Sequence, residues 1–134
     1  MSEPGVIKLE ALINRSPKDV WQALTDPALI GKWWAPGDVK AVVGHCFELD
    51  MGGHFGKQKC EVLAVEKERH FSYTFAPGTL NTTITWSLVP AGDATLLRLE
   101  HAGFDLDSPM GTAAYDGMGM GWPQLLEKIE SVIP

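Results

Sequence analysis

The chain has 134 residues, of which 45% are hydrophobic and 21% are charged, and its formal net charge at pH 7 is −6. This acidic balance excludes a nucleic-acid partner, since phosphate binding needs a basic face and the lysines and arginines here are scattered singly. The apolar runs are too short for membrane insertion, and the N-terminus lacks the basic start and apolar core of a secretory signal. We therefore expect one cytoplasmic domain over residues 1–134.

The first predicted elements are a strand and two short helices. Residues 6–14 alternate in polarity, which is typical of a half-buried strand. Ser16-Pro17 and Asp26-Pro27 each combine a helix N-cap with a proline suited to the first helical position. Helices this short are not stable alone in water, so both are expected to lie against the rest of the chain.

Residues 39–102 show a two-residue periodicity that turn residues interrupt. The expected strands cover residues 46–51, 57–65, 71–75, 80–88 and 95–101. The short connections between them, such as Gly52-Gly53 and Pro77-Gly78, predict an antiparallel meander. Clean alternation indicates a sheet with one buried face and one solvated face.

The end of the chain changes to a helical period. Trp122, Leu125, Leu126, Ile129, Val132 and Ile133 form one apolar stripe. The start of this helix stays open, because Gly117, Gly119 and Gly121 weaken a helix and Pro123 is best tolerated in a first turn. The predicted fold class is α+β, a curved antiparallel sheet of six to seven strands wrapped around the C-terminal helix.

Several motifs resemble a known superfamily. They are Ser16–Pro27, Lys32-Trp33-Trp34, Val43–Leu49 with Gly52-Gly53, Glu61-Val62-Leu63 before Arg69, Ala94–Leu99 with His101, and Gly121-Trp122. With the order of elements, they resemble the helix-grip fold of the START-like (SRPBCC) superfamily, which includes polyketide cyclases and lipid carriers. Within it the chain is similar to the branch named for the C-terminal domain of the heat-shock-chaperone ATPase activator. The departure is the Gly-Met-Gly-Met-Gly run at residues 117–121, where the long helix should begin.

The resemblance implies an apolar ligand between the last helix and the sheet, although fold alone does not carry activity. Candidate ligand-binding residues are Trp33, Trp34, Met51, Tyr73, Trp86, His101, Met118 and Trp122. A void is expected beside Trp86, Met118 and Trp122. The alternative is an ordinary filled core, because most such aromatic side chains simply pack. Trp33 and Trp34 are adjacent and cannot both point inward from one helix, so one of them is expected at a rim.

His101 is the best polar candidate, because it is in line with Leu97 and Leu99 and should face inward. An imidazole there could bind a ligand or carry a proton near neutral pH. The alternative is a core histidine satisfied by a neighbour, for which Tyr73 and Tyr115 are candidates. No catalytic residue is assigned beyond His101 and Tyr73 as weak candidates, and no cofactor is predicted.

Metal binding and a disulfide are both disfavoured. His45, Cys46, His54 and Cys60 belong to one hairpin region, but His45 and Cys46 are adjacent and point to opposite faces of a strand. Two reduced thiols are expected for Cys46 and Cys60 in a cytosolic chain.

Three functions remain open at this point. The first is a small-molecule binding protein for an apolar or aromatic ligand. The second is a cyclase-like or aromatase-like enzyme with His101 or Tyr73 as acid or base. The third and least supported is a chaperone-interacting module with an exposed apolar patch at Trp33-Trp34. A homodimer is possible through an open sheet edge or through the two tryptophans.

Overall fold

The computed structural model describes residues 5–53, 56–77 and 80–133. Its elements are β1 (Gly5–Ile13), α1 (Pro17–Thr25), α2 (Pro27–Trp33), β2 (Cys46–Asp50), β3 (Lys57–Glu66), β4 (His70–Phe75), β5 (Thr82–Ala91), β6 (Ala94–Phe104) and α3 (Pro109–Val132). The strands form one six-stranded sheet in the order β1-β6-β5-β4-β3-β2, and every neighbouring pair is antiparallel. The predicted α+β class is confirmed.

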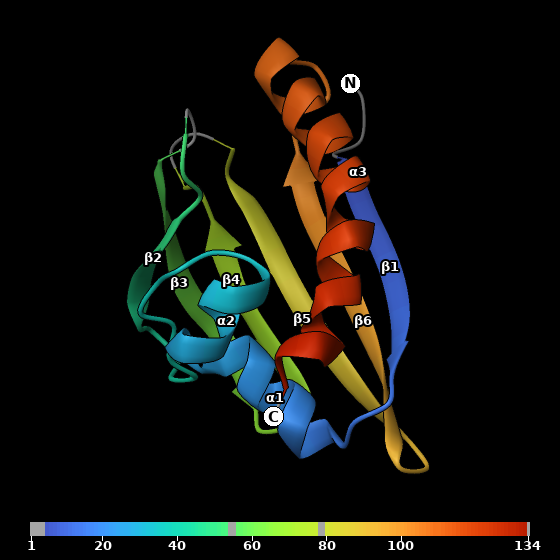
Figure 1. Cartoon of the computed structure of the whole chain (residues 1–134). Coiled ribbons are helices and arrows are strands. Elements are labelled where there is room, and N and C mark those ends of the chain that lie inside the picture. The colour runs from blue at the N-terminus through green and yellow to red at the C-terminus, as the bar shows by residue number, and fades with distance from the viewer. Residues whose placement is uncertain (1–4, 54–55, 78–79, 134) are drawn as a thin grey trace.

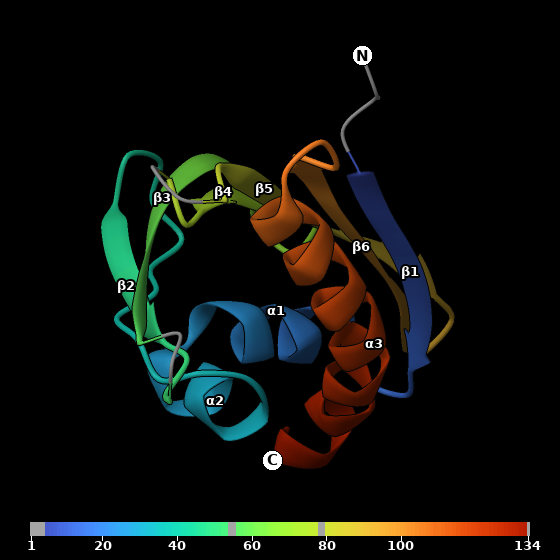
Figure 2. The ribbon, with the colours of Figure 1, turned by 90° about the horizontal axis from the view of Figure 1, so that it is seen from above.

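The sheet curves around the three helices. Seen from above, it runs as an arc from β2 through β4 and β5 to β1, and α3 lies inside the arc beside β6 and β1 (Figure 2). The helices α1 and α2 cover the lower part of the same concave side (Figure 1). This arrangement is the helix-grip fold expected from the sequence. It buries the apolar face of each strand and leaves the other face in water.

Both short helices begin where their caps predict. The Ser16 hydroxyl accepts the N–H of Asp19 at 3.3 Å, and the Asp26 carboxylate accepts the N–H of Ala28 at 2.9 Å. Each helix buries one apolar side; in α1 this side includes Val20. Tertiary packing therefore supplies the stability that helices of this length lack alone.

The last helix begins well before its apolar stripe. The Ser108 hydroxyl caps it by accepting the N–H of Gly111 at 2.9 Å, and Pro109 occupies the first turn. The helix then continues through the glycine run at 117–121 and through Pro123, which lies in its interior. The start of this helix, which the sequence left open, is therefore Pro109, 14 residues before Pro123. Burial of Trp122, Leu126 and Ile129 offsets the low helix propensity of this segment.

Among the described residues, none of the helices has the length and apolar character needed to cross a membrane.

Candidate functional site

A chain of hydrogen bonds joins α3 to the concave face of the sheet. The Trp122 indole N–H donates to Nδ1 of His101 at 3.1 Å, and Nε2 of His101 lies 2.8 Å from the Thr82 hydroxyl. An indole N–H can only donate, so Nδ1 accepts and Nε2 carries the proton. Thr82 then accepts from His101 and donates to the Phe75 carbonyl at 3.1 Å. Each of the three side chains in this hydrogen-bond chain, Trp122, His101 and Thr82, therefore has a partner.

His101 is a buried, neutral residue. Its side chain is fully buried, and rings of Phe75, Phe104 and Trp122 surround it at centroid distances of 4.5 to 5.9 Å. Burial lowers the pKa of His101 from 6.5 to about 3. Its partners are Thr82 and Trp122, and not Tyr73 or Tyr115. These contacts suit a residue that holds α3 in register against β6.

Tyr73 makes a second buried polar contact. Its hydroxyl accepts the Trp86 indole N–H at 3.0 Å, and both side chains are fully buried. Burial raises the pKa of the Tyr73 phenol well above its usual range. The phenol is therefore neutral over the whole range in which the protein is expected to be folded.

The adjacent tryptophans at the end of α2 have different environments. Trp33 is buried, and its indole N–H donates to the Ala23 carbonyl at 2.7 Å. Trp34 follows the last residue of α2 with φ −132° and ψ −84°, outside the helical region. Its half-buried ring stacks on Phe75 at 5.9 Å and tilts against Trp122 at 4.9 Å. Because the backbone of Trp34 is not helical, both rings can reach the core. Trp33 lies inside the core and Trp34 lies at the margin of the core.

Trp34 carries an unsatisfied donor. Within the part of the chain that the structure describes, its Nε1 is the one buried side-chain nitrogen or oxygen without a hydrogen-bond partner. Leaving a buried donor unpaired costs about 1–3 kcal/mol. Such an atom needs an explanation, and a bound acceptor is one.

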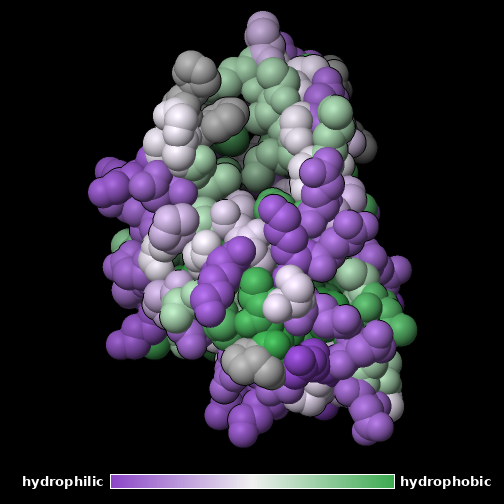
Figure 3. Space-filling model, viewed as in Figure 1, coloured by the Kyte–Doolittle hydropathy of each residue, from purple (hydrophilic) through white to green (hydrophobic). Residues whose placement is uncertain are grey.

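A hollow opens above α2, between the N-terminal half of α3 and the sheet (Figure 3). The elements around it carry apolar residues that are only partly buried and that pack against the core. In α3 they include Ala114 and Met118, and in the segments next to α2, β2 and β5 they include Trp34, Met51 and Leu80. Side chains of this kind are the usual lining of a pocket for an apolar ligand.

Glycine widens the side of α3 that carries Ala114 and Met118. Gly117 and Gly121 lie on this side by helical spacing, and a Cβ added at either one would meet no atom within 4 Å. Gly121 is nevertheless half-buried. Since Gly117 is exposed, the missing side chain leaves space beside the core at Gly121.

The predicted ligand residues fall into two groups. Trp33, Tyr73, Trp86, His101 and Trp122 are fully packed, and the Trp86 and Trp122 rings touch each other at 5.6 Å. Trp34, Met51 and Met118 are half-buried in the elements that border the hollow. The Trp86 and Trp122 rings therefore fill the space between helix and sheet at the point where the sequence predicted a void.

Sequence analysis missed several of these residues. Thr82 is at an inward position of an alternating strand, and a hydroxyl among apolar neighbours is a signal that it has a buried partner. Leu80 comes just before β5, and Ala114 lies in the part of α3 that the sequence did not assign to a helix. The placement of Ala114 depends on where that helix begins.

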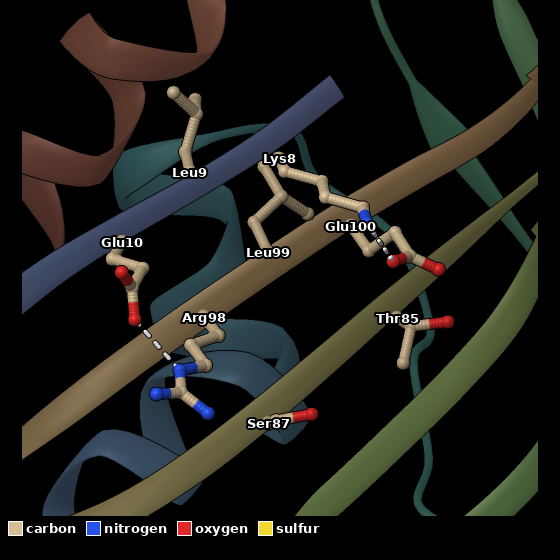
Figure 4. A pocket seen from close by; sticks show the side chains of 8 residues that line it. All are labelled: Lys8, Leu9, Glu10, Thr85, Ser87, Arg98, Leu99 and Glu100. Atoms are coloured by element: carbon tan, nitrogen blue, oxygen red, sulfur yellow. Dashed lines mark hydrogen bonds and ion pairs between the residues drawn. The ribbon is translucent and has the colours of Figure 1, made fainter. Parts of the chain in front are cut away.

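The outer face of the sheet has a shallow groove of a different kind. Its walls include Thr85 and Ser87 together with two ion pairs, Arg98 with Glu10 at 2.7 Å and Lys8 with Glu100 at 3.8 Å (Figure 4). All four charged side chains are at least half exposed. Solvent screens such pairs, and this surface does not suit an apolar ligand.

The two cysteines are unpaired and lie on opposite faces of the β2–β3 pair. Cys46 is opposite Glu61 and exposed, whereas Cys60 is opposite Phe47 and buried. Burial raises the pKa of the Cys60 thiol to about 12. In the described ranges no three His, Cys, Asp or Glu side chains are grouped as metal ligands; His54 lies outside those ranges.

Comparison with known proteins finds a matching family and solved structures with the same fold. The family model described as "Activator of Hsp90 ATPase homolog 1-like protein" matches residues 14–133. The crystal structure of MLL2253 from Mesorhizobium loti is 37% identical, with a TM-score of 0.84 and 96% of each chain covered. Among proteins with curated descriptions, none matches the chain.

Two more distant structures share the fold. The solution structure of the Aha1 dimer from Colwellia psychrerythraea is 19% identical, with a TM-score of 0.79 and 96% of each chain covered. DynU16, from the dynemicin biosynthetic locus, is 18% identical with a TM-score of 0.77; the match covers 94% of this chain and 46% of that one. At these identities the likeness concerns the fold alone.

Proposed function

Because the chain belongs to the activator of Hsp90 ATPase homolog 1-like family, within the START-like (SRPBCC) superfamily, we propose that it binds a small apolar or aromatic molecule. The site is the hollow between α3 and the sheet, and its expected location in the cell is the cytoplasm. The observation that carries the proposal is the buried Trp34 indole N–H, which has no partner among the described residues and belongs to a ring that packs on Phe75 and Trp122.

The surroundings define the chemistry of the ligand. The Trp34 ring packs on Phe75 and Trp122, so a planar ligand can stack against the margin of an aromatic cluster. Half-buried hydrophobic side chains, among them Met51 and Met118, pack against the same core, and burying a charge without a partner is costly. The ligand is therefore neutral and carries one acceptor, such as a carbonyl oxygen, for the Trp34 N–H.

An enzyme of the cyclase or aromatase kind has less support. Both nitrogens of His101 are engaged in hydrogen bonds, and the Tyr73 hydroxyl accepts from Trp86. Their pKa values, lowered for His101 and raised for Tyr73, keep both groups from exchanging protons near neutral pH. These two residues are better explained as parts of the core that positions α3.

A chaperone-interacting module has no support at the expected place. That alternative requires an exposed patch at Trp33-Trp34, but Trp33 is buried and Trp34 is half-buried against Phe75 and Trp122. Assembly into a homodimer is part of our proposal, and the structure from Colwellia psychrerythraea is described as a dimer.

A matched pair of probes tests the binding site. 2-Acetylnaphthalene has a carbonyl acceptor, and 2-isopropylnaphthalene has a similar shape without one. Both should change the tryptophan fluorescence of the protein, and the ketone should bind more tightly. The variant Trp34→Phe keeps an aromatic ring but lacks the N–H, so it should lose about five-fold in affinity for the ketone alone. If neither probe binds, and native mass spectrometry of the purified protein finds no bound organic molecule, the proposal fails.

A further inference from the structure

The strand β1 forms an open edge of the sheet. Within the described residues it is hydrogen-bonded to β6 on one side and has no neighbouring strand on the other. A groove runs beside its C-terminal half, bordered by Leu9–Ile13 and by residues of α3 that include Pro123 and Glu130. Edge strands with exposed apolar residues are templates for pairing with another chain. In β1, Val6 is 38% exposed and Leu12 is 61% exposed.

The opposite edge is protected. The N–H of Asp50 in β2 donates to the Pro36 carbonyl at 2.8 Å, and Gly37 forms a bridge with Leu49. Gly37 permits this close approach, because a Cβ there would clash with the Glu48 carbonyl. The segment before β2 thus covers that edge, and β1 is the edge that remains open.

The sequence of β1 is self-complementary about its centre. When two copies run antiparallel with Leu9 opposite Leu9, Lys8 of each copy lies opposite Glu10 of the other. In the same register Val6 lies opposite Leu12, so the two exposed apolar residues also meet. All four side chains are on the exposed face of the strand. We propose that two copies of this chain pair through β1 in this register and join their sheets into one.

Other registers of the pair of β1 strands are less favourable. Centring the pair on Lys8 places that lysine opposite its own copy, and centring it on Glu10 does the same with the carboxylate. Like charges directly opposite each other are destabilising. A slip by a single residue would place exposed side chains opposite buried ones. The Leu9-centred register is therefore the one in which both charge and hydrophobicity match.

The ion pairs within each chain extend across this seam. Lys8 contacts Glu100 and Glu10 contacts Arg98 in the neighbouring strand, and Figure 4 shows both β1 side chains directed toward β6 while Leu9 points away. The side chains of Lys8 and Glu10 remain 74% and 55% exposed, so each can contact a second partner. The resulting row alternates in sign, from Arg98 through Glu10 to Lys8 and Glu100 of the second copy.

Sedimentation equilibrium of the full chain at micromolar to millimolar concentration tests the interface. The variant Lys8→Glu places two carboxylates opposite each other, and Glu10→Lys places two ammonium groups opposite each other. Each variant alone should weaken the dimer about ten-fold. An equimolar mixture of the two variants restores opposite charges at the seam, so it should recover the dimer as a heterodimer. Circular dichroism checks that each variant is folded.

Two results would overturn the interface. One is a wild-type chain that stays monomeric up to millimolar concentration. The other is a dimer that either single variant leaves unchanged, which would place the contact elsewhere on the molecule. Neither result bears on the hollow between α3 and the sheet, because β1 pairs on the outer edge.

Discussion

The indole N–H of Trp122 in α3 donates to Nδ1 of His101 in β6 at 3.1 Å, inside the aromatic core. This bond determines the tautomer of the imidazole and directs its N–H toward Thr82. The long helix is therefore held on the sheet by a specific polar contact as well as by apolar packing. Substituting His101, the middle residue of this hydrogen-bond chain, should reveal how much the contact contributes to the stability of the fold.

We expect His101→Leu to lower the free energy of unfolding by about 2–4 kcal/mol, because the Trp122 N–H and the Thr82 hydroxyl would each lose a buried partner. His101→Gln retains a donor and an acceptor and should cost less. Urea denaturation of both variants gives the comparison. Equal losses would mean that the hydrogen bonds do not matter and that only the shape of the ring does.

The same histidine predicts an acid dependence of stability. Its pKa is lowered from 6.5 to about 3 in the folded protein, so between these values the unfolded chain binds a proton that the folded chain does not. Stability from this group is complete above pH 6.5 and falls by about 1.4 kcal/mol per pH unit as the pH decreases toward 3. Urea denaturation between pH 7 and pH 5 should show a steeper loss for wild type than for His101→Gln. If the free energy of unfolding falls equally with pH in both proteins, the lowered pKa of His101 is contradicted.

Thr82 offers a test that separates bonding from packing. Thr82→Val keeps the shape but removes the hydroxyl between His101 and the Phe75 carbonyl, so it should cost about 1–3 kcal/mol. Thr82→Ser keeps the hydroxyl and loses one methyl group, which should cost about 1 kcal/mol. Thermal unfolding ranks the two variants. A serine variant less stable than the valine variant would show that packing dominates here.

The sequence was sufficient for most of the fold but not for the polar core. Alternation along β5 and β6 and the caps at Ser16 and Asp26 depend on local chemistry, which a single sequence displays directly. The partners of His101 lie 19 and 21 residues away along the chain, and no local pattern specifies that distance. The start of α3 stayed open in the sequence because its glycines have low helix propensity, and only the structure shows that burial outweighs this.

The cysteines should react at very different rates. Cys46 is exposed and should react with a thiol reagent in the folded protein. Cys60 is buried with its pKa raised to about 12, so its thiolate is scarce and shielded until the chain unfolds. One thiol should therefore be titrated in native buffer and two in denaturant. Two fast thiols in native buffer would show that the β2–β3 pair opens readily.

Gly121 connects stability with the proposed ligand. It lies inside α3, and an added Cβ meets no atom within 4 Å, so Gly121→Ala should stabilise the protein by about 0.5–1 kcal/mol. Gly111→Ala is the matched control. It should destabilise the protein, because its Cβ would clash with the Asp105 carbonyl. A larger side chain, as in Gly121→Leu, should fill part of the hollow and weaken binding of 2-acetylnaphthalene while the protein stays folded. Undiminished binding by this variant would move the ligand away from α3.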